Sequence, residues 1–171
     1  MFQGDGYIDE AFDKKQVKQI VTSFGQCLKD EVFGEFNGLA CRGSSGLLIA
    51  PILAHTFDLH LMLVRKPKDN SHAYYTLNYN DEVKKYIIID DFACSGKTIE
   101  GIVEDVEQES TKRMIQSPIF IGCYFWQNAN IGNNKEKIAC SDNKRFEKYA
   151  KNKIYVARKN DSYLLDTFKG Y

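Results

Sequence analysis

The sequence has no surplus of either charge and no long apolar segment. Its 171 residues carry 23 basic and 23 acidic side chains, for a formal net charge of +0. This balance argues against a protein that binds nucleic acid or a membrane surface mainly through charge, because such a protein needs a basic surplus. The longest apolar stretches, such as residues 119–126, are far shorter than the ~20 residues that span a bilayer. The N-terminus has no apolar run of the signal-peptide kind.

Cysteine is too scattered for a disulfide framework or a zinc site. There are five cysteines, an odd number, and they form no CxxC pair. We therefore expect free thiols in a reduced, cytoplasmic setting. The sequence also lacks repeats, low-complexity tracts and Pro/Gly linkers, while 43% of its residues are hydrophobic. We expect one domain over residues 1–171, with enough apolar side chains for a sizeable core.

Apolar periodicity predicts an α/β fold. A helical face over residues 17–28, with Asp13 as its N-cap, and another over 99–106 predict amphipathic helices. Residues 47–57 are apolar on all sides and predict a buried helix that follows a turn at 42–46 and has Pro51 in its first turns. Short apolar runs predict strands at 38–41, 61–64, 86–89 and 119–126. Strands that are apolar on both faces and alternate with helices indicate a mainly parallel sheet with helices on both sides.

Two segments fit this pattern less well. Residues 153–156 and 162–165 predict two short strands or one hairpin. Residues 65–85 have no helical periodicity, and such a connection is much longer than the ~2–6 residues usual in α/β units. A lid, a binding loop and an unrecognised hairpin all remain open for this segment.

The most informative stretch is YIIIDDFACSGKT, residues 86–98. An apolar strand ends in Asp90 and Asp91, and a loop of small residues then leads into a helix. Small residues let backbone N–H groups approach a phosphate, and the helix N-terminus adds free donors and a favourable dipole. Two carboxylates can accept hydrogen bonds from sugar hydroxyls or lie near a bound Mg²⁺. The stretch therefore predicts a sugar-phosphate site.

Two other interpretations of the same stretch remain. Residues 95–98 match the end of a P-loop, but Asp91 stands where the first glycine of that motif belongs. The stretch could also be a strand that ends in a polar turn and caps a helix, without a ligand.

Residues 87–98 resemble the phosphoribosyl-diphosphate signature of the type I phosphoribosyltransferases. Residues 38–46 resemble that family's first strand and diphosphate loop, with Arg42-Gly43-Ser44 where Arg-Gly-Gly is usual. Residues 63–66 resemble its Val-Arg-Lys run, and the long loop that follows corresponds to its mobile active-site loop. The resemblance covers about residues 38–126. It implies a type I phosphoribosyltransferase-like α/β domain with a small hood from the terminal segments.

The resemblance also implies a reaction and its residues. The family transfers ribose 5-phosphate from phosphoribosyl diphosphate, bound with Mg²⁺, to a nitrogenous base and releases pyrophosphate. Asp90 and Asp91 would hold the ribose hydroxyls and, indirectly, the metal. The 5′-phosphate would lie on Ala93, Cys94, Ser95, Gly96, Lys97 and Thr98. The diphosphate would lie on Arg42, Gly43 and Ser44, with Arg65 and Lys66 neutralising its charge as it leaves.

The acceptor is less well defined. Members that act on hypoxanthine and guanine carry a carboxylate at the position of Cys94, so this chain resembles the orotate and adenine types more. Lys68 and His72 are candidates for reaching the diphosphate from the long loop, and Trp126 is a candidate for stacking on the base or for the core. An alternative function is a non-catalytic module that binds phosphoribosyl diphosphate or a nucleotide and acts with a protein partner. We expect a homodimer or a complex with such a partner.

Overall fold

The computed structural model describes residues 11–66, 77–91 and 97–126, together with the backbone of 153–157 and 162–165. Its centre is a seven-stranded sheet in the order β3-β2-β1-β4-β5-β6-β7. The strands, listed in chain order, are β1 (Gly38–Cys41), β2 (His60–Val64), β3 (Leu77–Asn78), β4 (Lys85–Asp90), β5 (Ile119–Phe125), β6 (Lys153–Ala157) and β7 (Ser162–Leu165). All neighbouring pairs are parallel except the two at the edges, β2 with β3 and β6 with β7. The expectation of a mainly parallel sheet is confirmed.

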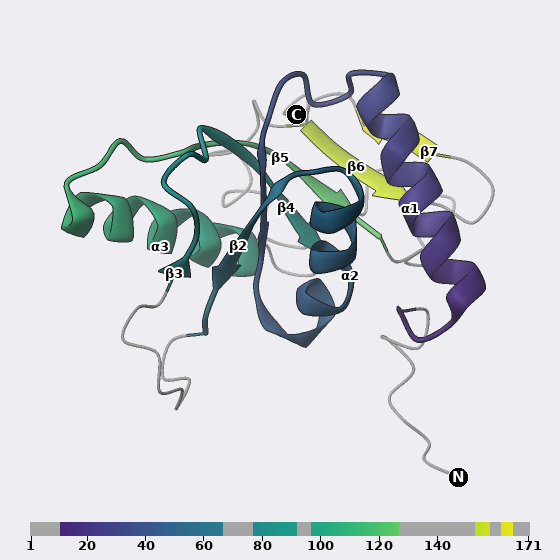
Figure 1. The fold of residues 1–171 in the computed structure, drawn as a ribbon, viewed down its shortest axis with the longest axis horizontal. Helices are drawn as coiled ribbons and strands as arrows, with labels where there is room; N and C mark the ends of the chain where they lie inside the picture. Colours follow the sequence, from purple (N-terminus) through teal and green to yellow (C-terminus); the bar gives the residue numbers. More distant parts are fainter. Residues whose placement is uncertain (1–10, 67–76, 92–96, 127–152, 158–161, 166–171) are drawn as a thin grey trace, which may run out of the picture.

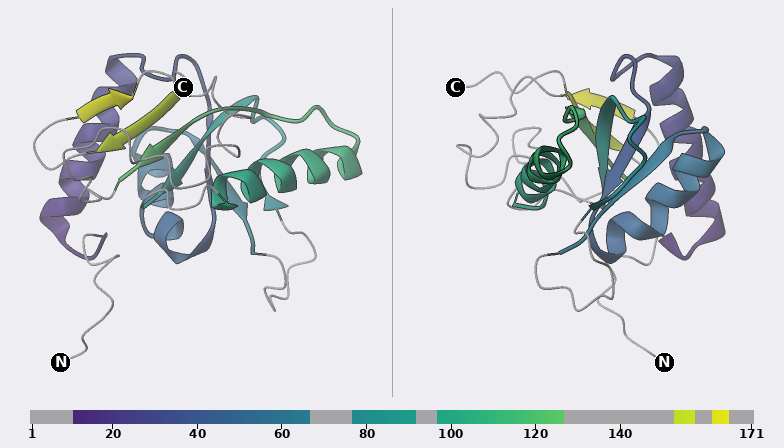
Figure 2. Two further views of the ribbon diagram at one scale, coloured as in Figure 1. Left: turned by 180° about the vertical axis from the view of Figure 1, so that it is seen from behind. Right: turned by 60° about the vertical axis from the view of Figure 1, so that its left-hand side comes forward.

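Helices cover both faces of this sheet (Figures 1 and 2). One face carries α1 (Lys14–Lys29) and α2 (Gly43–Thr56), and the other carries α3 (Lys97–Arg113). Alternate residues of β4 serve the two layers: Ile87 and Ile89 pack under α1 and α2, and Ile88 packs under α3. Because both faces are buried, the strands are apolar throughout rather than alternating with polar residues.

The predicted helices over 17–28 and 99–106 are confirmed within α1 and α3. Asp13 caps α1 as expected, since its side chain accepts hydrogen bonds from the backbone N–H groups of Lys15, at 2.7 Å, and Gln16, at 3.1 Å. The segments at 153–157 and 162–165 form an antiparallel pair of strands that extends the sheet beyond β5. Among the described helices, none has the length and apolar character needed to cross a membrane.

The start of α2 differs from the expected turn. The helix begins at Gly43, directly after the strand, so residues 43–46 are its first turn and Pro51 lies in its interior. Gly43 has a φ of +73°, a conformation that glycine adopts without steric cost. The chain therefore passes from β1 into α2 without a separate loop. This abrupt passage places the first turn of α2 at the carboxyl end of the sheet.

The long connection after β2 also contains an element that the periodicity did not reveal. Leu77 and Asn78 form β3, which runs antiparallel to the end of β2. Arg113 of α3 holds this edge by donating to the carbonyl of Leu77, at 2.9 Å, and by lying over the ring of Tyr79. The hairpin interpretation is thus confirmed for the part of the connection that the structure describes, and residues 67–76 lie outside that part.

Candidate functional site

Of the predicted ligand residues that the structure describes, those that follow β1 and those at the end of β4 lie close together at the edge of the sheet. From β1 the chain crosses through α2 to β2, and from β4 it crosses through α3 to β5 on the opposite side. Since β1 and β4 are parallel neighbours, the strand order reverses between them. Open α/β sheets bind ligands outside the carboxyl ends of their strands at such a switch point. Cys41 and Asp90 end the two strands there.

Asp90 is one of the two buried carboxylates of this site and, like Asp91, has 6% of its surface exposed. Its Oδ1 accepts a hydrogen bond from the Ser45 hydroxyl at 2.8 Å and another from the backbone N–H of Asp91 at 3.0 Å. Burial raises the pKa of Asp90 to about 7, and the charge of Asp91 adds to the rise, whereas the Ser45 hydrogen bond opposes it. Asp90 therefore changes its charge near neutral pH.

The groups that interact electrostatically with Asp90 come from several elements. They are Ser45 on α2, Cys41 on β1, Asp91 after β4, and Cys123 on β5. Burial and then the charge of Asp90 raise the pKa of Cys41 to about 12, and the same two causes raise the pKa of Cys123. Both thiols are consequently neutral and supply no charge to the site. The described cysteines Cys27, Cys41 and Cys123 are buried thiols that form no disulfide, as the sequence predicts.

The first turn of α2 forms the second part of the site. Its N-cap, Arg42, makes no side-chain hydrogen bond to the turn. A Cβ atom at Gly43 would lie 3.2 Å from Cε and 3.5 Å from Nζ of Lys66, so the Lys66 ammonium group lies beside this helix terminus. Ser44, in the same turn, is exposed. Free N–H donors, a helix dipole and an ammonium group together suit an anion.

The side chain of Arg42 points to α3 rather than toward the α2 terminus. It donates to the carbonyl of Gly101 at 3.1 Å and pairs with the Asp105 carboxylate, and only 8% of its surface is exposed. The diphosphate role that the resemblance implies for Arg42 and Gly43 therefore depends on backbone groups. This pairing could not be predicted from the sequence, because a contact between residues 63 positions apart leaves no local pattern.

The remaining predicted residues lie around these two parts. Lys97 and Thr98 are exposed on the first turn of α3, and Arg65 follows β2 with its Nε buried and without a hydrogen-bond partner in the described part of the chain. The predicted residues outside the described ranges are Lys68, His72, Ala93, Cys94, Ser95 and Gly96.

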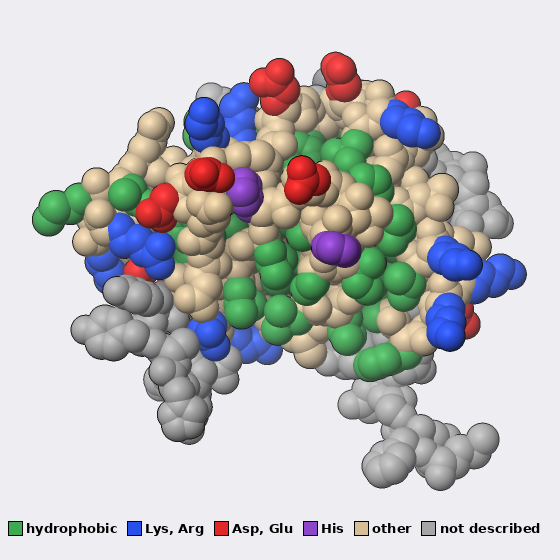
Figure 3. Space-filling model, viewed as in Figure 1, with side chains coloured by type: hydrophobic (Ala, Val, Ile, Leu, Met, Phe, Trp, Pro, Cys, Tyr) green, Lys and Arg blue, Asp and Glu red, His purple; other side chains and the backbone are tan. Residues whose placement is uncertain are grey.

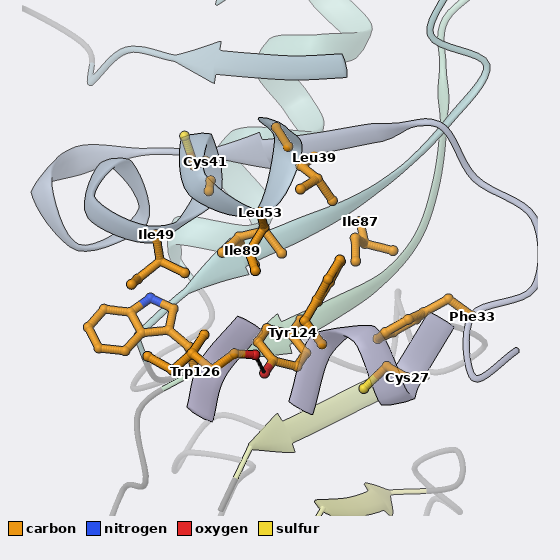
Figure 4. Close-up of a cluster of buried hydrophobic side chains, with 14 of the residues drawn as sticks. Cys27, Phe33, Leu39, Cys41, Ile49, Leu53, Ile87, Ile89, Tyr124 and Trp126 are labelled. Atoms are coloured by element: carbon orange, nitrogen blue, oxygen red, sulfur yellow. Dashed lines mark hydrogen bonds between the residues drawn. The ribbon is translucent and has the colours of Figure 1, made fainter. Parts of the chain in front are cut away.

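Trp126 lies in the core rather than on an open surface. Only 2% of it is exposed, and it belongs to the apolar cluster that includes Ile49 of α2 and Tyr124 of β5 (Figure 4). In the same cluster, the Tyr124 hydroxyl donates to the carbonyl of Ile20 on α1. This placement supports the core alternative for Trp126, because a ring that stacks on a base must expose one face.

The site offers a metal ion two adjacent carboxylates and no complete ligand shell. Among the described residues, no group of three or more His, Cys, Asp or Glu side chains could hold a metal ion. Mg²⁺ is usually bound through one or two carboxylates together with waters and substrate phosphates. Asp90 and Asp91 fit that mode, in which a bound polyphosphate would complete the shell.

No protein-family model matches the chain, and the search of curated protein sequences gives no significant match. Solved structures do match in fold. The adenine phosphoribosyltransferase of Saccharomyces cerevisiae, solved with an imino-altritol bisphosphate and adenine, has a TM-score of 0.50 at 18% identity over 66% of this chain and 68% of its own. A phosphoribosyltransferase of Corynebacterium diphtheriae has a TM-score of 0.52 at 14% identity over 67% of each chain.

The orotate phosphoribosyltransferase of Mycobacterium tuberculosis, solved with inorganic phosphate, has a TM-score of 0.50 at 12% identity over 67% of this chain and 59% of its own. This chain thus spans only about three fifths of that enzyme. At these identities the likeness concerns the fold. The fold is that of the type I phosphoribosyltransferases, as the resemblance of the sequence implied.

Proposed function

We propose that the chain is a Mg²⁺-dependent phosphoribosyltransferase that transfers ribose 5-phosphate from phosphoribosyl diphosphate to a nitrogenous base. One observation carries the proposal: the first turn of α2, with Lys66 beside it, adjoins the Asp90 carboxylate through the Ser45 hydrogen bond. An anion-binding helix terminus and a buried acid are therefore next to each other. A ribose that carries a diphosphate needs this pairing of groups.

In this proposal, each part of the site recognises one part of the donor. Backbone N–H groups of Gly43 and Ser44 hold the diphosphate, and Lys66 and Arg65 neutralise its charge as it leaves. Asp90 and Asp91 accept hydrogen bonds from the ribose hydroxyls. Lys97 and Thr98 belong to the 5′-phosphate site together with residues 93–96, and Lys68 and His72 approach the diphosphate from the long loop.

Positioning and electrostatics supply most of the catalysis in such a reaction, because the sugar becomes cationic while a polyanion departs. Two carboxylates close to the ribose favour positive charge on it, and the α2 terminus with Lys66 favours the departing diphosphate. Asp90 and Asp91 would hold Mg²⁺ together with the bound donor, and the metal would supply charge neutralisation for the leaving group.

For the acceptor, we propose orotate, adenine or a related base rather than hypoxanthine or guanine. Cys94 occupies the position at which the hypoxanthine–guanine type carries a proton-accepting carboxylate. A thiol, whose ordinary pKa is about 8.5, is a poor substitute for that group. An acceptor that arrives deprotonated, such as orotate, needs no such base.

The test is pyrophosphate release from phosphoribosyl diphosphate, with Mg²⁺, across a panel of bases. We expect turnover with at least one base outside the hypoxanthine–guanine pair, and calorimetric binding of the donor. The double variant Asp90→Asn with Asp91→Asn should lose donor affinity while its circular dichroism stays that of wild type. Absence of donor binding by wild type would contradict the proposal. Tight donor binding without turnover of any base would instead support the non-catalytic binding module with a protein partner.

The proposed homodimer or partner complex has one motivating surface. Figure 3 shows hydrophobic side chains gathered around α2 on the face opposite α3. Leu47 and Ile52 are 41% and 38% exposed there, although a helix that is apolar on all sides is normally buried. Sedimentation of the purified chain at several concentrations tests whether this face associates with a second copy.

A further inference from the structure

The side chain of Arg42 links the two crossover helices next to the site. Arg42 precedes the first residue of α2, and its Nη2 reaches both the Gly101 carbonyl and the Asp105 carboxylate on α3. It is buried, and Asp105 is 24% exposed. Hydrogen bonds to charged groups are stronger than neutral ones, and a partly buried pair is screened less by salt than a surface pair. The link therefore restrains α3 against the start of α2.

Gly101 makes room for this link. A Cβ atom at position 101 would overlap Nη1 of Arg42. Glycine in a helix interior costs stability relative to alanine, so the sequence carries an unfavourable residue where the guanidinium crosses the helix. Gly101 lies one turn after Lys97, the first residue of α3. The restraint thus acts close to the helix terminus where the 5′-phosphate is proposed to bind.

We infer that Arg42, with Asp105, is a positioning residue that fixes the separation between the diphosphate site at the start of α2 and the 5′-phosphate site at the start of α3. The inference rests on the proposed function, because it assumes that one ligand occupies both sites. Arg42 contacts neither phosphate through its guanidinium in this role. It acts through the helices that it joins.

Such a role has a measurable consequence. A donor that carries both anionic groups binds more tightly than either fragment because its second contact is intramolecular, and this benefit depends on the spacing of the two sites. A change in the spacing weakens the donor and leaves each fragment unaffected. A merely structural role would weaken the fragments and the donor together.

The experiment compares wild type with Asp105→Asn and Gly101→Ala. Asp105→Asn removes the charge that Arg42 faces, and Gly101→Ala displaces the guanidinium while keeping both charges. Glu104→Gln is the matched control, since Glu104 is an exposed carboxylate on the same helix. Calorimetry with Mg²⁺ gives the dissociation constants of phosphoribosyl diphosphate, of ribose 5-phosphate and of pyrophosphate for each protein.

We expect the two test variants to bind the donor about tenfold more weakly, with fragment affinities and the control unchanged. Equal losses for the donor and both fragments, or no loss for the donor in Gly101→Ala, would overturn the inference and leave the proposed function standing. Wild type that binds none of the three ligands would overturn both. If Asp105→Asn fails to fold, Gly101→Ala decides the question, because alanine favours the helix.

Discussion

The Ser45 hydroxyl donates a 2.8 Å hydrogen bond to Oδ1 of Asp90, 45 positions away in the sequence. Ser45 lies in the first turn of α2 and Asp90 ends β4, so this contact joins the two parts of the proposed donor site. It also opposes the effect of burial, because a hydrogen bond to a carboxylate favours its charged form. The charge of Asp90 near neutral pH therefore depends on Ser45.

Removal of the Ser45 hydroxyl should raise the pKa of Asp90 further above its present value of about 7. In Ser45→Ala, burial and the neighbouring Asp91 act without opposition from that hydrogen bond. If the ionised carboxylate accepts hydrogen bonds from the ribose, the pH at which donor affinity falls by half should move upward. Calorimetric titrations of the donor between about pH 5.5 and pH 9 measure this midpoint, because this range spans the titration of Asp90.

Ser45→Thr is the control for this prediction, since threonine keeps a hydroxyl at the same position. Its midpoint should stay close to that of wild type. Identical midpoints in Ser45→Ala and wild type would show that the hydroxyl has no influence on Asp90.

Replacement of Asp90 by asparagine should stabilise the protein at alkaline pH. The pKa of Asp90 is raised from 3.8 to about 7, so between these values the folded state holds a proton that the unfolded state has released. The stability contributed by this group is complete below pH 3.8 and is lost as the pH rises through about 7. Above about pH 7, the buried negative charge of Asp90 opposes folding, and the variant Asp90→Asn removes this charge.

Urea unfolding at pH 8 should give Asp90→Asn a gain on the order of 1–3 kcal/mol over wild type, and the gain should shrink toward pH 5. Glu104→Gln controls for the loss of an exposed carboxylate. A gain in Asp90→Asn that is the same at both pH values would refute the assignment of the raised pKa to Asp90.

The sequence was sufficient for the parts of the fold that depend on local pattern. Apolar runs located β1, β2, β4 and β5, and a helical face together with the capping Asp13 located α1. The acid pair at the end of β4 was placed at the ligand-binding edge because open parallel sheets bind ligands at the carboxyl ends of their strands. Only periodicity, caps and composition were needed for these predictions.

Side-chain contacts between residues far apart in the chain could not be predicted from the sequence. Neither the Ser45 hydrogen bond to Asp90 nor the pairing of Arg42 with Asp105 has a local signal, because each joins segments that only the sheet topology brings together. The sequence left a hairpin open for residues 65–85 but did not locate the two-residue strand β3, for a similar reason: the strand is held by β2 and Arg113 rather than by its own pattern.

The fluorescence of Trp126 should report a core residue. It is the only tryptophan of the chain, so its emission is free of other indoles. Because it is buried among apolar side chains, its emission should be blue-shifted and poorly quenched by acrylamide. Addition of donor and base should change the emission of Trp126 only slightly. Strong quenching by the base alone would indicate stacking and contradict the core placement.

Gly43→Ala should cost both stability and donor affinity, and Gly34→Ala separates the two causes. Both glycines have positive φ, +73° at Gly43 and +70° at Gly34, so alanine at either position carries a conformational cost of about 1–2 kcal/mol.

The two positions differ in what a Cβ atom would contact: at Gly34 it meets nothing within 4 Å, whereas at Gly43 it meets Cε of Lys66 at 3.2 Å. The methyl group at position 43 therefore crowds the Lys66 side chain, which must shift by a few tenths of an ångström at the start of α2. Urea unfolding should show similar losses in the two variants, but calorimetry with pyrophosphate and Mg²⁺ should show weaker binding only in Gly43→Ala. Equal pyrophosphate affinities in the two variants would mean that Lys66 and the α2 terminus do not form a common anion site.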